Sequence, residues 1–178
     1  MSFVKSGNTS VPVSRSQGQL EKLLRRYGCS GFAVSNDYLE ALITVSFRVP
    51  DGPGHDAPFI PVRLQVQTRL VYDALYGRPV SRKWDDDARK YRDEWNPNGY
   101  SAQLLQHAER VAWRQLVLWV DAACSAANAG VQKMSEAFFA HTVVRGDDGD
   151  LRRVIELVDQ LGGVGGWRAL LPAGKEAQ

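Results

Sequence analysis

The chain has 178 residues, a formal net charge of +2 and two cysteines. This length favours a single domain, and a nearly balanced charge does not by itself require a nucleic-acid partner. Cys29 and Cys124 lie far apart in apolar surroundings, which predicts buried thiols of a reducing cytoplasm and not a metal site. The N-terminus has no hydrophobic signal core, so we expect a cytoplasmic protein without a membrane segment.

The first half of the sequence predicts a helix followed by three strands. Residues 1–13 are polar and predict a flexible arm, and leucines at helical spacing predict a helix from 14 to 27, which Gly28 ends. A short strand is expected at 32–35. Alternating apolar residues predict half-buried strands at 39–49 and 59–68. Because these strands are short and locally connected, we expect an antiparallel meander; residues 70–80 give no clear assignment.

Residues 81–95 combine dense charge with aromatic residues at helical spacing, and we predict a helix here. Its oppositely charged side chains four residues apart contribute about 0.2–0.5 kcal/mol per pair. Trp84, Tyr91 and Trp95 share one face of this helix, and a wide apolar helical face is normally buried. The alternative is that these three side chains are exposed and anchor a partner protein.

The most apolar run of the chain lies within residues 101–130, which predict a long central helix. Ser101 suits its N-cap and Gly130 its end. Leu116 and Trp119 are predicted to face the core, while Arg110 and Arg114 lie on the opposite polar stripe.

Shorter elements are expected after Gly130. Residues 135–141 predict a short helix and 142–144 an extended segment, and Asp150 suits the N-cap of a helix to residue 161. Trp167 is expected to pin the tail back onto the body, and residues 173–178 to be frayed. Together the elements predict an α+β fold: a small antiparallel three-stranded sheet packed on the central helix, in one domain from 14 to 172.

No motif for catalysis, metal binding or a cofactor is complete. The glycines at 162–166 lack the strand, the third glycine and the lysine that nucleotide loops require. Asp85, Asp86 and Asp87 suit the start of a helix better than a cation site. His55, His107 and His141 are scattered. We therefore expect no catalytic residue, metal ligand or cofactor, and a protein that is not an enzyme; an enzyme would need folding to bring a histidine beside a cysteine or several carboxylates.

Basic residues are the remaining candidates for function. Lysines and arginines that face one groove between sheet and helix would bind phosphates, and aromatic rings beside them would stack on bases. The alternative is that these basic residues are exposed on the surface and have no role in binding. The candidates for nucleic-acid contact are Arg25, Arg26, Arg48, Arg63, Arg69, Arg82, Lys83, Arg110 and Arg114.

Two resemblances add to this interpretation. Leu20, Leu24, Arg26, Tyr27, Gly28 and Phe32, with Arg110, Trp113 and Arg114, Phe138 to His141 and Leu170 to Pro172, resemble small uncharacterised proteins of phages and mobile elements from GC-rich bacteria. That resemblance implies no established activity.

The order of three meandering strands and a long helix is similar to the core of the single-strand annealing proteins of phage recombination modules. It implies a ring-forming homo-oligomer that binds single-stranded DNA in recombination, repair or replication. The expected function is therefore non-enzymatic binding of single-stranded DNA. The alternative is a protein-interaction factor, an inhibitor or adaptor directed at a host or defence protein, with Trp84, Tyr91 and Trp95 as its interaction surface.

Overall fold

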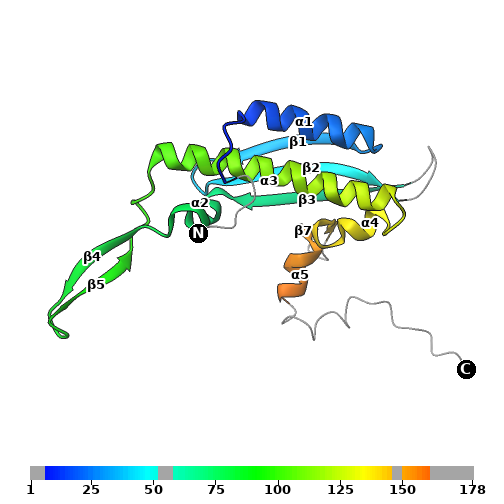
Figure 1. Cartoon of the computed structure of the whole chain (residues 1–178). Helices are drawn as coiled ribbons and strands as arrows, with labels where there is room; N and C mark the ends of the chain where they lie inside the picture. The colour runs from blue at the N-terminus through cyan, green and yellow to red at the C-terminus, as the bar shows by residue number, and fades with distance from the viewer. Residues whose placement is uncertain (1–6, 52–57, 146–149, 161–178) are drawn as a thin grey trace, which may run out of the picture. The chain divides into compact units, whose positions relative to one another are not determined.

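The structure is a computed structural model that describes residues 7–51, 58–145 and 150–160. It contains helices together with antiparallel strands that follow one another along the chain, which confirms the predicted α+β class. The first half contains α1 (Val13–Arg26), β1 (Ser30–Asp37), β2 (Leu42–Pro50), β3 (Phe59–Gln67) and α2 (Thr68–Tyr76), and then β4 (Val80–Asp85) and β5 (Lys90–Trp95). The second half contains α3 (Ala102–Asn128), α4 (Met134–Ala137), the 3-10 turn η1 (Phe139–His141), β6 (Val143–Arg145), β7 (Leu151–Arg153) and α5 (Val154–Gln160) (Figure 1).

The chain divides into two compact units. The first holds α1 and the segments 34–44 and 65–122; the second holds the segments 27–33 and 45–64 and the described residues after 122. The sheet has the order β1-β2-β3, the predicted meander, and its strands and α3 each contribute residues to both units.

The first unit is built around α1 and most of α3. On α1, Leu20 and Leu24 are fully buried one turn apart. The predicted central helix is confirmed as α3, and the Leu105 N–H donates to the Ser101 backbone oxygen at 2.8 Å. Its buried side chains form one wide face, which accounts for its central position: Ala108, Val111, Ala112, Trp113, Leu116, Val117 and Val120.

The second unit is built on alternating strand residues. Val45, Phe47 and Val49 of β2 are buried, as the period of two predicts, and the residues between them are less so. The Phe47 ring meets Phe138 edge-on, with centroids 5.4 Å apart. This contact joins the strand to the short elements after Gly130, where a φ of +76° ends the central helical segment as expected for glycine.

The helix predicted for residues 81–95 is wrong, because the structure forms the antiparallel pair β4–β5 there. Asp85 Oδ1 accepts the Ala88 N–H at 2.9 Å, and Arg89 has a φ of +45°, so residues 85–89 make a turn. Side chains opposite each other on paired strands share a face. The aromatic residues that would line one side of a helix therefore line one side of a hairpin.

Two details of the helices also differ from expectation. Trp119 was predicted to be in the core but is 41% exposed, whereas Trp113, next to the predicted polar stripe, is fully buried. The helix expected from Asp150 begins at Val154, after the short strand β7, and Leu151 is exposed. There the Glu156 carboxylate accepts the Arg153 N–H at 2.9 Å, which explains the later start. The predictions for 1–6 and 161–178, including Trp167, lie outside the described residues.

Candidate functional site

A group of exposed apolar and aromatic side chains of the first unit lies on the β4–β5 hairpin. The register pairs Val80 with Trp95, Arg82 with Asp93 and Trp84 with Tyr91, so these six side chains share one face. We call it the aromatic face. Val80, Trp84, Tyr91 and Trp95 are 55%, 51%, 65% and 55% exposed. The Trp84 and Tyr91 rings pack edge-on at 5.1 Å, a pairing that holds the face together in the absence of a core behind it.

The other face of the hairpin is charged. Lys83 Nζ lies 2.7 Å from Glu94 Oε2, and Arg92 Nε lies 2.6 Å from Asp85 Oδ2. The hydrogen bond to Glu94 is the largest cause of the raised pKa of Lys83. Arg82 and Asp93 form a third, looser pair at 3.6 Å between the aromatic residues. Because basic and acidic side chains neutralise each other across the strands, the hairpin does not present a field of one sign.

The base of the hairpin is fixed to α2 and to the segment before α3. The Arg78 guanidinium lies 5.7 Å from the centroid of the Trp95 ring and also contacts Asp73 at 3.3 Å. Asp73 in turn accepts a hydrogen bond from the Tyr100 hydroxyl at 3.1 Å. The hairpin is therefore attached at its base, while no other strand among the described residues pairs with β4 or β5.

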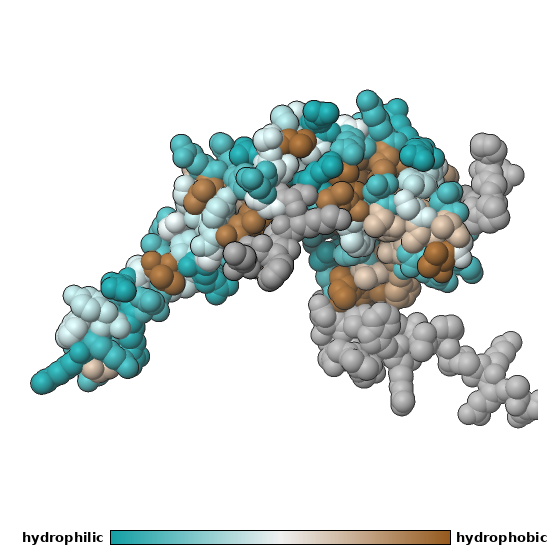
Figure 2. Space-filling model, in the orientation of Figure 1, coloured by the Kyte–Doolittle hydropathy of each residue, from teal (hydrophilic) through white to brown (hydrophobic). Residues whose placement is uncertain are grey.

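The prediction that these aromatic residues are buried is wrong. Figure 2 shows the hairpin surface as mostly teal and pale, because tryptophan and tyrosine fall near the middle of this hydropathy scale. The signal that would have found the hairpin is the even spacing of its apolar residues: Val80 and Trp84 before the turn, and Tyr91 and Trp95 after it, are each four residues apart.

Five of the predicted basic candidates contact other side chains or the backbone of the first unit. Arg25 pairs with Glu21 at 2.6 Å, Arg82 with Asp93, and Lys83 with Glu94. Arg69 donates to the Leu39 oxygen at 3.0 Å and lies 5.7 Å from the Tyr100 ring centroid, and Arg114 donates to Gln19 Oε1 at 2.8 Å.

The other candidates differ in surroundings. Arg26 is exposed, whereas the Nε of Arg110 is buried and has no hydrogen-bond partner among the described residues. Arg48 is exposed on β2 and Arg63 is half-buried on β3, and both alternate with buried neighbours. These two belong to the second unit, and Arg110 and Arg114 to the first.

Among the residues that the structure describes, the side chains that could act as nucleophile or base do not come together. Burial raises the pKa of the Cys29 thiol to about 11, and Cys124 is fully buried; both are buried thiols outside any disulfide, as the sequence predicts. His107 Nδ1 contacts the Tyr76 hydroxyl. Burial, and then the charge of Arg153, lowers the pKa of His141. Within the described residues no three histidine, cysteine or acidic side chains cluster as metal ligands would.

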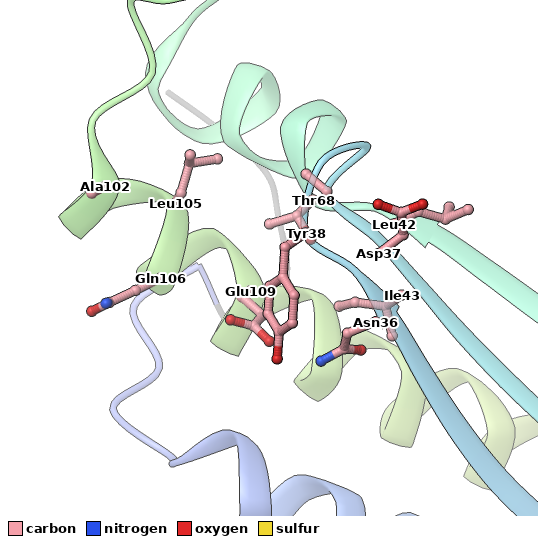
Figure 3. A pocket seen from close by; sticks show the side chains of 11 residues that line it. Asn36, Asp37, Tyr38, Leu42, Ile43, Thr68, Ala102, Leu105, Gln106 and Glu109 are labelled. Carbon is pink, nitrogen blue, oxygen red and sulfur yellow. The ribbon is translucent and has the colours of Figure 1, made fainter.

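A pocket of about 360 Å³ lies in the first unit, between the β1–β2 turn, the start of α2 and the start of α3 (Figure 3). Its lining residues include the apolar Leu42, Ile43 and Leu105 and the polar Asn36, Asp37 and Glu109. This pocket was not predicted, because its lining residues come from segments that are about 70 residues apart in the sequence.

No helix of the described residues is long and apolar enough to cross a membrane. Comparison with protein-family models, with curated proteins and with solved structures finds no match to the chain. The function is therefore inferred from the hairpin and the pocket.

Proposed function

We propose that the protein is an interaction factor, an adaptor or inhibitor that docks on another protein through the aromatic face of the β4–β5 hairpin. The observation that carries this proposal is the exposure of Trp84, Tyr91 and Trp95 on one face of a hairpin that no described helix of the same unit covers (Figure 1). Tryptophan and tyrosine are enriched among the residues that dominate binding energy at protein interfaces.

The energetics of the hairpin support a docking role. An isolated two-stranded hairpin is marginally stable in water, since it has no core on either face. Here cross-strand ion pairs and the Trp84–Tyr91 contact contribute stability, at about 0.2–1 kcal/mol for each cross-strand pair. A partner that covers the aromatic face would supply the missing second layer.

The charges of the hairpin favour a protein over a polyanion. Between residues 78 and 95 the sequence has six basic and five acidic side chains. Such a segment attracts a phosphate backbone weakly, because counterion release scales with the number of phosphates that are neutralised. We infer that the partner surface is apolar and carries its own pair of opposite charges to meet Arg82 and Asp93.

Binding of single-stranded DNA is the second candidate. The same exposed rings would stack on bases, and Arg78 beside Trp95 would contact a neighbouring phosphate. This candidate predicts affinity that falls steeply with salt, unlike docking on an apolar protein surface.

The test is selection of binders from a random peptide library on the immobilised protein. The variant carries Trp84→Ser and Tyr91→Ser, and the matched control carries Asp86→Ser and Asp87→Ser in the turn of the same hairpin. We expect enriched peptides to bind the wild type and the control, and to lose binding to the aromatic variant by tenfold or more, since interface anchors contribute about 2 kcal/mol or more.

Two results would contradict the docking proposal. One is that selected peptides bind the aromatic variant as well as the wild type. The other is that no peptide is enriched while an oligonucleotide of single-stranded DNA binds at low salt and is released at high salt; that outcome supports the second candidate. Circular dichroism of each variant verifies its fold.

A further inference from the structure

The pocket of the first unit does not include the residues of the aromatic face, and the charged residues that line it are all acidic. Of its charged lining residues, Asp37 and Glu109 are acidic and none is basic. Asp37 is already engaged, because its Oδ1 accepts the N–H groups of Leu39 and Glu40 at 3.0 and 3.1 Å. Arg69, the basic residue bonded to the same turn, donates to the Leu39 backbone oxygen.

Glu109 is the other carboxylate of the pocket, and it takes part in none of these contacts. It is half-buried on α3 and has no hydrogen bond or ion pair among the described residues. A cation beside this carboxylate would form a charge-assisted hydrogen bond that no described side chain already makes. Glu109 is therefore the carboxylate of the pocket that is available to a cationic ligand.

Asn36 supplies a second polar group on the opposite wall. Its Oδ1 is buried without a hydrogen-bond partner among the described residues, and Figure 3 shows its amide nitrogen on the side of Glu109 and Tyr38. Nitrogen and oxygen of such an amide are assigned from the hydrogen-bond network. Rotation of the amide by a half-turn would present the oxygen to the pocket as an acceptor for an N–H donor.

The rest of the pocket fits an apolar, flat group. Ile43 and Leu105 are among its apolar lining residues, and the Tyr38 ring stands at its edge, 84% exposed. A volume of about 360 Å³ is at the small end of the range for ligand pockets. We infer that this pocket binds a small organic cation, an ammonium or guanidinium group joined to a flat apolar body, with Glu109 as the counter-charge.

The experiment is an NMR titration of the full chain, labelled with ¹⁵N, at low salt. The probe is 2-phenylethylamine, and the neutral probe of the same shape is 2-phenylethanol. We expect the amine to shift the amides of residues 36–43 and 102–109, with a dissociation constant on the order of 1 mM for so small a ligand. The alcohol should bind at least about tenfold more weakly, since it lacks the charge-assisted bond.

Two variants locate the counter-charge. Glu109→Gln should weaken the amine about tenfold or more, and Glu40→Gln, which alters an exposed carboxylate of the same turn outside the lining, should leave it unchanged. Ala102→Phe, at an exposed lining position of α3, should block binding with Glu109 intact. Equal binding of alcohol and amine, shifts confined to other residues, or an unaffected Glu109→Gln variant would overturn the inference. None of these outcomes bears on the aromatic face, so the two proposals fail separately.

Discussion

The two tryptophans of α3 allow a direct test of which face of this helix is the core. The sequence pattern selects Trp119, whereas the structure buries Trp113 completely and leaves Trp119 41% exposed. We therefore compare Trp113→Ala with Trp119→Ala. Both changes remove the same side chain from the same helix, so differences in helix propensity cancel.

The expected cost follows from buried area. A fully buried tryptophan removes about 200 Å² from water, or about 5 kcal/mol at ~25 cal/mol per Å². The compact unfolded chain already covers part of this surface, which lowers the figure to about 4 kcal/mol. Trp113 Nε1 is buried without a hydrogen-bond partner among the described residues, and removing it returns about 1 kcal/mol. We expect Trp113→Ala to lower the free energy of unfolding by about 3 kcal/mol.

Trp119→Ala should cost less. Roughly three fifths of this side chain is covered, so the same area figure of about 4 kcal/mol scales to about 2.4 kcal/mol; its partly open site adds no cavity cost, whereas the enclosed site of Trp113 adds one beyond the area figure. The measurement is urea unfolding followed by far-UV circular dichroism, because fluorescence would change with the tryptophan itself. A larger loss for Trp119→Ala than for Trp113→Ala would refute the assignment of the buried face.

Two further predictions concern the backbone and a carboxylate. Gly130 has a φ of +76°, so Gly130→Ala should lower the free energy of unfolding by about 1 kcal/mol in the same urea assay. Gly18 lies inside α1 with open space around its Cα, so Gly18→Ala should raise the free energy of unfolding by about 0.5–1 kcal/mol. The opposite sign for both variants would contradict both assignments. Burial raises the pKa of Glu156, but hydrogen bonds from the Arg153 N–H and guanidinium, with the charge of Arg63, outweigh it and the pKa is lowered. A lowered pKa contributes stability above the unfolded value of 4.5 that is lost as the pH falls below it. The destabilising effect of Glu156→Gln should therefore be present at pH 7 and shrink below pH 4.5; an effect that is constant with pH would show that the charge of Glu156 does not matter.

The sequence was sufficient to predict the elements whose residue pattern is compatible with only one type of secondary structure. The alternating residues of 39–49 have the period of a strand, and the run from 101 to 130 is too long and too apolar for anything but a helix. These two features already imply the α+β class. Both cysteines were also placed correctly, because their neighbours are apolar.

The hairpin shows why the candidate site was harder to predict. Trp84, Tyr91 and Trp95 are spaced 7 and 4 residues apart, which suits one face of a helix. The same residues also share one face of a hairpin when a turn lies between the first and the second. Ion pairs of a few tenths of a kcal/mol are available in both arrangements. Local sequence therefore did not separate the two, and the choice decided whether these rings are core or surface.

The strongly periodic elements, and the lack of a complete catalytic motif, can be recognised from the residues alone. Which faces of those elements meet other chain segments follows from the packing of distant parts of the chain. Trp113 and Trp119 are about 120° apart around α3, and both border its wide apolar face. Which one is buried depends on where the neighbouring segments pack. The same holds for Glu109, since a carboxylate becomes a candidate ligand-binding group only when distant segments enclose it without supplying a cation.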